Sequence, residues 1–203
     1  MRRVIVYIDG FNFYFGLRDS GFRRYFWLDV LKLAETLLLE DQRLESVHYF
    51  TARVSGGGKE RRQRSYLDAL GTLPRDRVTV RYGKYQMSPR TCLHCGAQDE
   101  VPGEKMTDVN IAVEMLTHAF QDRFDTALLI SGDSDLRGPV ERIRTLFPAK
   151  KVVIAFRPGR FSAELKAAAT AVFRIGRANL AKSQFPERIE TPDLTVKRPE
   201  TWS

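Results

Sequence analysis

Four aspartates stand where regular structure is expected to begin or end. An apolar run at residues 4–8 stops at Asp9, and a second run at residues 125–131 leads into Asp133 and Asp135. Asp108 opens a helical pattern further along the chain. Ligands of open parallel sheets collect at the carboxyl ends of the strands. We therefore expect Asp9, Asp108, Asp133 and Asp135 to meet at one edge of a sheet.

Such a cluster of acids needs a counter-charge. Two ionised carboxylates about 4 Å apart repel each other by about 4 kcal/mol at an effective dielectric constant of about 20. A divalent cation removes this cost, and ligands that are all oxygens favour Mg²⁺ or Mn²⁺. Such an ion can activate water and stabilise the leaving oxygen of a phosphodiester. The four aspartates are therefore candidate metal ligands and candidate catalytic residues.

Polar residues near these acids are candidates for holding them or for contacting substrate. Asn12 follows Asp9 by about one helical turn and can hydrogen-bond a carboxylate or a phosphate. Ser131 and Ser134 can hold acid side chains in place, and Lys105 can offer positive charge to a phosphate.

A basic segment follows the glycines at 56–58. It contains Arg61, Arg62 and Arg64, which can follow a nucleic-acid backbone from a mobile loop. The glycines lack the spacing of a P-loop, which excludes nucleotide hydrolysis of that type. The whole chain carries 33 Lys and Arg against 25 Asp and Glu, a net charge of +8. This balance favours a polyanionic partner, RNA or another single-stranded nucleic acid.

Strand and helix patterns alternate along the 203 residues, which predicts an α/β fold with a mostly parallel central sheet between two helical layers. The expected strands are 3–8, 46–53, 78–82, 125–131, 151–156 and 171–175. The expected helices are 28–40, 59–71, 106–121, 135–147 and 162–169. We expect one domain over residues 1–178, interrupted by an irregular excursion at 83–103, and a flexible or draped tail at 179–203.

Composition restricts the setting of the protein. No stretch of eighteen apolar residues exists, and the chain starts with a charged-flanked strand, so we expect neither a membrane span nor a signal peptide. Two cysteines are too few for the disulfide framework of a small secreted protein. A cytoplasmic location is the resulting expectation.

Cys92 and Cys95 form a CxxC knuckle that resembles half of a zinc ribbon. A structural zinc ion needs four ligands, so the fold would have to bring in His48, His118 or a carboxylate, or two chains of a homodimer would share the ion. A redox-active pair and an inert loop are the alternatives.

Two further acids have simpler interpretations. Asp125 precedes its strand and therefore belongs to the opposite edge of the sheet, away from the proposed cluster. Glu114 falls inside a helix, where a solvated or paired surface role is expected.

Three motifs in this order resemble the NYN-domain family, within the PIN-like nuclease superfamily. They are Asp9-Gly10-Phe11-Asn12 after a strand, the segment 104–109 at a helix start, and the segment 131–135 after another strand. The resemblance spans about residues 3–175. It implies a PIN-like, Rossmann-like α/β/α sandwich and a Mg²⁺- or Mn²⁺-dependent ribonuclease, acting as an endonuclease, with the four aspartates as its site. Met106-Thr107 departs from the Gly-Val or similar pair that often precedes the aspartate.

Other interpretations of the same residues stay open. Each aspartate taken singly can serve as a helix cap. A protein with this fold and acid cluster can also be a nucleic-acid-binding or regulatory protein with weak or no catalysis. A small-molecule phosphatase is a third alternative, but Asp9 is not followed by a second acid two residues later.

Overall fold

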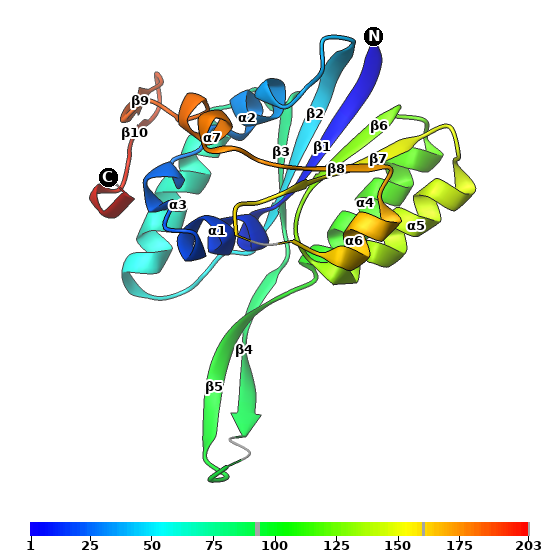
Figure 1. Ribbon diagram of the computed structural model, residues 1–203. Coiled ribbons are helices and arrows are strands. Elements are labelled where there is room, and N and C mark those ends of the chain that lie inside the picture. Colours follow the sequence, from blue (N-terminus) through cyan, green and yellow to red (C-terminus); the bar gives the residue numbers. More distant parts are fainter. Residues whose placement is uncertain (92–93, 160, 203) are drawn as a thin grey trace.

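The computed structural model describes residues 1–91, 94–159 and 161–202 and is built around a six-stranded parallel sheet (Figure 1). The strand order is β3-β2-β1-β6-β7-β8. The strands are β1 Arg2–Asp9, β2 Gln42–Thr51, β3 Val78–Tyr82, β6 Thr126–Ile130, β7 Lys151–Phe156 and β8 Ala171–Arg174. The expected parallel α/β fold is confirmed.

Helices cover both faces of this sheet because its central strands are apolar on both sides. In β1, Val4, Val6 and Ile8 pack into one core cluster, whereas Ile5 and Tyr7 pack into the other. The first cluster includes helices α1 Gly10–Asp19, α2 Val30–Thr36, α3 Gly57–Gly71 and α7 Arg177–Lys182. The second includes α4 Thr107–Phe120, α5 Arg137–Leu146 and α6 Ala163–Ala168.

The strand order reverses beside β1. β1 pairs with β2 on one side and with β6 on the other, with Ile8 opposite Ile130. Adjacent strands therefore deliver Asp9 and the segment after Ile130 to the same edge. Asp125, at the other end of β6, forms an ion pair with Arg3 (2.8 Å), as expected for an acid outside the cluster.

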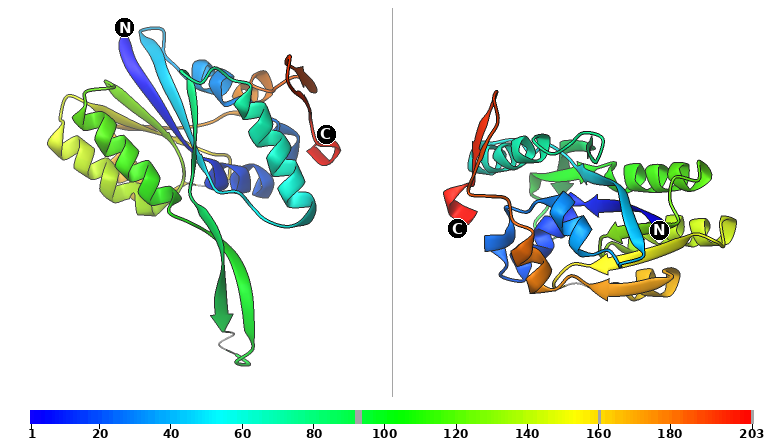
Figure 2. Two further views of the ribbon diagram at one scale, coloured as in Figure 1. Left: turned by 180° about the vertical axis from the view of Figure 1, so that it is seen from behind. Right: turned by 90° about the horizontal axis from the view of Figure 1, so that it is seen from above.

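The segment expected to be an irregular excursion is a β-hairpin instead. β4 Lys84–Thr91 pairs antiparallel with β5 Gln98–Lys105. Views from the front and from behind show it projecting away from the sheet (Figures 1 and 2). Both strands are mostly polar in sequence, so they lack the apolar alternation that indicates a half-buried strand.

The first part of the chain also differs from the expected elements. Helix α1 follows β1 immediately and was not among the expected helices, although the sequence left open that Asp9 caps a helix. The helix expected over 28–40 is the shorter α2, preceded by the 3₁₀ turn η1 Arg23–Tyr25. Asp29 ends the intervening chain and caps α2 by accepting from the Lys32 amide (3.0 Å).

The last residues are draped over the domain. Residues after α7 form a small antiparallel pair, β9 Arg188–Glu190 and β10 Thr195–Lys197, and then the turn η3 Glu200–Trp202. Trp202 is 6% exposed and packs against Phe26, Trp27 and Tyr66. The end of the chain therefore completes the first core cluster. No helix in the described residues has the length and hydrophobicity needed to cross a membrane.

Candidate metal centre

Asp9 is held between the end of β1 and the start of α1. It caps α1, because its Oδ1 accepts the Asn12 amide hydrogen at 3.0 Å. Its Oδ2 accepts the Ser131 hydroxyl hydrogen, also at 3.0 Å, and the residue is only 3% exposed. A carboxylate has about four acceptor positions, so each oxygen keeps one for a further partner.

Three of the four predicted aspartates meet. Carboxylate oxygens of Asp9, Asp108 and Asp133 lie within 4.8 Å of one another. Asp108 lies in the first turn of α4, and Asp133 precedes the 3₁₀ turn η2 Ser134–Leu136. We call these three residues the carboxylate cluster.

Asp135 lies beside the carboxylate cluster. Its amide donates to Asp133 Oδ1 at 3.1 Å, so the two aspartates share the η2 turn. Its negative charge is also among the causes that raise the pKa of Asp108, after burial and Asp133. Asp135 therefore adds to the negative electrostatic potential at the carboxylate cluster.

Burial and nearby negative charges raise the pKa values of Asp9 and Asp108. Burial raises the pKa of Asp9 to about 6, and the charges of Asp108 and Asp133 add to the effect. Burial is also the main cause of the raised pKa of Asp108. A divalent cation would relieve both penalties, and an all-oxygen donor set fits Mg²⁺ or Mn²⁺.

Glu104 is a further acid at this edge, which sequence reasoning did not assign. Burial raises its pKa to about 7, and the charges of Asp9 and Asp108 contribute. Its side chain accepts a hydrogen bond from the Thr107 hydroxyl. Glu104 is the last but one residue of β5, and Asp108 lies in the first turn of α4. Met106 joins the two elements in the left-handed region (φ 76°). The sequence signal that could have identified Glu104 is its place in the same motif as Asp108, at residues 104–109.

Asn12 links three parts of the site. Its Oδ1 accepts from the Gly132 amide (3.0 Å) and from Arg157 Nε (2.9 Å). Arg157 follows β7 and is 5% exposed, so it brings a buried positive charge close to the acids. The sequence showed only a basic cluster near Arg157. Gly10 permits the close approach of α1 to β2, because a Cβ there would lie 2.6 Å from the Tyr49 hydroxyl.

The two serines differ in their contacts. Ser131 is fully buried; besides donating to Asp9, its hydroxyl accepts from the Asp133 amide at 3.1 Å. Ser134 is half-buried in η2, and no described residue hydrogen-bonds its hydroxyl. Ser131 thus ties two members of the carboxylate cluster together.

The predicted basic residues occupy different places. Lys105 is exposed at the base of the hairpin, where it pairs with Lys84 across the two strands. Arg61 and Arg64 are exposed on α3, and Arg62 lines a cavity. Of the predicted zinc ligands, Cys92 falls outside the described residues and Cys95 is an exposed free cysteine.

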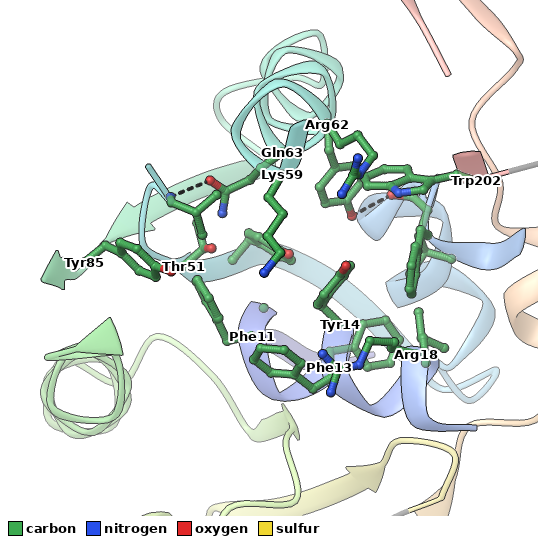
Figure 3. Close-up of a pocket in the computed structure, with 18 residues that line it drawn as sticks. Phe11, Phe13, Tyr14, Arg18, Thr51, Lys59, Arg62, Gln63, Tyr85 and Trp202 are labelled. Carbon is green, nitrogen blue, oxygen red and sulfur yellow. Dashed lines mark hydrogen bonds between the residues drawn. The ribbon is translucent and has the colours of Figure 1, made fainter. Parts of the chain in front are cut away.

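An aromatic cavity of about 170 Å³ lies between α1, β2 and α3 (Figure 3). Gly10, directly after Asp9, lines it together with residues of α1, β2, α3 and Trp202. Lys59 and Arg62 contribute positive charge. The rings of Phe11 and Tyr85 are nearly parallel, at 25°, with centroids 6.4 Å apart.

Comparisons with known proteins agree with this architecture. The chain matches the NYN domain over residues 3–176, which confirms the resemblance noted in the sequence. A crystal structure of a Vibrio parahaemolyticus protein of unknown function has the same fold, with a TM-score of 0.58 and 21% identity, covering 91% of this chain and 96% of that one.

One curated relative matches in sequence. It is 6-hydroxy-3-succinoylpyridine 3-monooxygenase HspA of Pseudomonas putida, 28% identical over 98% of this chain and 75% of its own length. The reaction in its name belongs to that protein.

Proposed function

Because the chain belongs to the NYN-domain family, we propose that it is a metal-dependent ribonuclease whose catalytic centre is the carboxylate cluster. The observation that carries the proposal is the convergence of Asp9, Asp108 and Asp133 oxygens within 4.8 Å. Three acids from separate segments, one of them buried, form an arrangement that a divalent cation stabilises.

The chain's own residues have distinct roles in this proposal. Asp9, Asp108 and Asp133 would hold Mg²⁺ or Mn²⁺, which supplies positive charge to the attacking water and to the leaving oxygen. Ser131 and the Asn12 amide fix Asp9 through hydrogen bonds. Glu104, with a pKa of about 7, is suited to exchange a proton with substrate or water near neutral pH.

The cavity favours an unpaired strand as substrate. Aromatic faces such as Phe11 and Tyr85 stack with bases of any sequence, and duplexed bases cannot reach them. Lys59 and Arg62 line the same cavity and can neutralise the phosphates of that strand. Single-stranded RNA therefore fits the site and the net charge of +8 together.

The test is cleavage of labelled single-stranded RNA by the wild-type protein and by Asp133→Asn, with Mn²⁺, with Mg²⁺ and with EDTA. Asp76→Asn is the matched control, because Asp76 is exposed and precedes β3, at the opposite edge of the sheet. We expect metal-dependent cleavage by wild type and Asp76→Asn only. Asp133→Asn should still bind RNA.

A second set of variants tests the substrate. Phe11→Ala and Tyr85→Ala should each weaken RNA binding by about 10-fold, because stacking contributes about 1–3 kcal/mol per base. Phe120→Ala, which removes an 83% exposed ring at the far end of α4, should leave binding unchanged. Salt-sensitive RNA binding without cleavage under any metal condition would instead identify a binding protein.

A further inference from the structure

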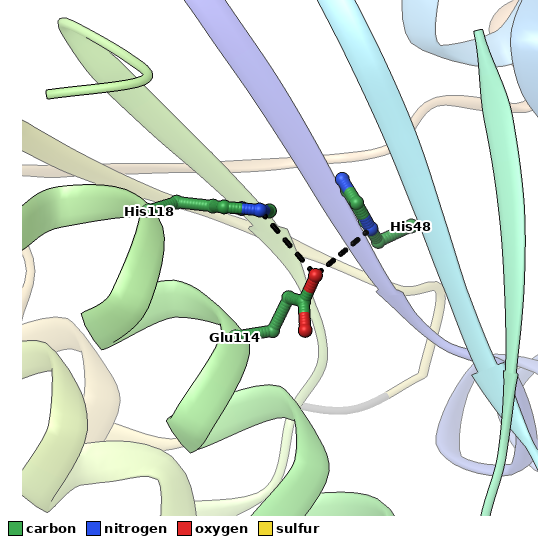
Figure 4. Close-up of side chains that lie close together, drawn as sticks. All are labelled: His48, Glu114 and His118. Atoms are coloured by element: carbon green, nitrogen blue, oxygen red, sulfur yellow. Dashed lines mark ion pairs between the residues drawn. The ribbon is translucent and has the colours of Figure 1, made fainter. Parts of the chain in front are cut away.

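A second cluster of metal-ligating side chains lies between the sheet and α4, apart from the carboxylate cluster (Figure 4). His48 comes from β2, and Glu114 and His118 come from successive turns of α4. Glu114 Oε1 lies 3.3 Å from His118 Nε2 and 3.7 Å from His48 Nδ1. One ligand atom of each residue falls within 4.8 Å of the other two.

The Nδ1 atom of His48 is unsatisfied. The residue is 6% exposed, its Nε2 lies 3.1 Å from the Ser46 hydroxyl, and no described residue hydrogen-bonds its Nδ1. If Nδ1 carries the hydrogen, the Glu114 oxygen at 3.7 Å is too distant for a hydrogen bond. If Nε2 carries it, the Nδ1 lone pair faces a carboxylate oxygen. A cation between His48 Nδ1 and Glu114 Oε1 would bind both atoms, so neither an unpaired hydrogen nor two facing lone pairs would remain.

His118 is oriented for the same role. Its Nδ1 lies 2.9 Å from the hydroxyl of Tyr7, a fully buried residue of β1. A hydrogen on Nδ1 can be donated to this hydroxyl, which leaves a lone pair on Nε2 directed at Glu114. Metal-bound histidines characteristically donate their other ring hydrogen to such a partner.

We propose that His48, Glu114 and His118 bind a zinc ion. Two imidazoles and one carboxylate form a ligand set that zinc uses, whereas Mg²⁺ prefers oxygen ligands alone. A water molecule completes a tetrahedral arrangement. Three protein ligands are fewer than the four of most structural zinc sites, but both histidines are buried. The ion would therefore link α4 to the sheet and not meet substrate.

Charges around the cluster have opposing effects on cation binding. Arg81 Nη2 lies 2.6 Å from Glu114 Oε1, and the charge of Arg123 also reaches both histidines. Arg81 is 45% exposed, so its side chain can turn into solvent when a cation takes this oxygen. The Glu114 carboxylate, whose Oε1 lies within 3.7 Å of a ring nitrogen of each histidine, supplies the negative charge that attracts a cation.

Zinc at this position would fix the helix that carries part of the carboxylate cluster. Asp108 stands in the first turn of α4 and His118 in its last, about 15 Å apart along the helix axis. Because His48 belongs to β2, the ion would cross-link α4 to the sheet that positions Asp9. The zinc site and the carboxylate cluster share a helix but no ligand.

Zinc binding to the purified 203-residue chain tests the proposal. The parent protein carries Cys92→Ser and Cys95→Ser, which removes the CxxC knuckle, and excess Mg²⁺ keeps zinc from the carboxylate cluster. Calorimetric titration should give one zinc ion per chain. His48→Gln and Glu114→Gln should each weaken binding by at least about 10-fold, as should Tyr7→Phe, which removes only the partner of His118. His94→Gln, which alters an exposed histidine, is the control and should bind like the parent.

Two further measurements separate loss of the site from loss of the fold. Circular dichroism with a chelator should show the parent, Glu114→Gln and Tyr7→Phe equally folded, and zinc should raise the Tm of the parent alone by several degrees. Co²⁺ in place of zinc should give visible bands of nitrogen and oxygen ligation. A folded parent that binds no zinc, or binding that Glu114→Gln and His48→Gln leave unchanged, would overturn the proposal.

Discussion

The hydroxyl of Ser131 donates a hydrogen bond to Asp9 Oδ2 at 3.0 Å, joining two residues that are 122 positions apart in the chain. The contact exists because β1 and β6 are neighbours at the point where the strand order reverses. The same hydroxyl accepts from the Asp133 amide. One buried side chain thus connects two acids of the carboxylate cluster.

Replacing Ser131 by Ala should destabilise the protein and weaken metal binding together. The Asp9 carboxylate and the Asp133 amide would lose the Ser131 hydroxyl as their partner. This loss should lower the free energy of unfolding, measured by urea denaturation, by about 1–2 kcal/mol. The Ser131 hydrogen bond also lowers the pKa of Asp9, so Mn²⁺ affinity should fall most below pH 7. Ser134→Ala is the control and should change neither quantity by more than about 0.5 kcal/mol.

Metal-induced stabilisation should depend on pH through Asp9. The pKa of Asp9 is raised from 3.8 to about 6 in the folded protein, so folding without metal favours the protonated acid. The stability that protonated Asp9 contributes to the metal-free protein is fully present below about pH 3.8 and is lost as the pH rises through about 6. Metal binding needs the ionised form of Asp9, so the stabilisation that metal gives should increase as the pH rises through about 6.

The rise in Tm caused by Mn²⁺ should therefore be small at about pH 5 and larger at about pH 7.5. Thermal melts with and without Mn²⁺ at each pH measure it. An Asp9→Asn variant should lose most of this pH dependence. A Mn²⁺ effect equally large at both pH values would argue against Asp9 as a ligand.

Met106 occupies a backbone conformation that glycine adopts more easily. Its φ of 76° places it in the left-handed region, directly before α4. Met106→Gly should raise the free energy of unfolding by about 1 kcal/mol, because the left-handed conformation costs a residue with a Cβ about 1–2 kcal/mol. Met106→Ala keeps the Cβ and should give no such gain in the same urea titration.

Trp202 anchors the end of the chain to the first core cluster. Trp202→Ala should lower the free energy of unfolding by about 3 kcal/mol, since it removes a large ring that is 6% exposed. Leu194→Ala, at a residue of the same segment that is 43% exposed, is the control. Equal stability of the two variants would mean that the end of the chain does not dock.

The central sheet and most of the carboxylate cluster were predictable because strong local patterns specify them. β1 is largely apolar and ends at Asp9, and β6 is an apolar run that is separated from Asp133 by two residues. Parallel strands on either side of a topological switch then bring Asp9 and Asp133 together without further information. Asp108 was predictable from its place in a motif at a helix start.

Features that depend on distant contacts were less accessible. Glu104 reaches the site through the left-handed Met106, and a residue with a Cβ gives no signal for that turn. The approach of His48 to Glu114 depends on how α4 packs on β2. The sequence offered His48 and His118 only as possible ligands for zinc at the CxxC knuckle, and it gave Glu114 a surface role. The β4–β5 hairpin is mostly polar in sequence, so it lacks the strong apolar alternation that indicates a strand.

The central claim is that the carboxylate cluster binds the metal used for RNA cleavage. The most direct measurement compares the Mn²⁺ dissociation constant from calorimetry with the Mn²⁺ concentration that half-saturates cleavage, in wild type and in Asp108→Asn. We predict that the two values agree in wild type and that Asp108→Asn raises both by the same factor, at least about 10-fold. Cleavage that persists in EDTA, or a half-saturating concentration that Asp108→Asn leaves unchanged, would contradict the claim.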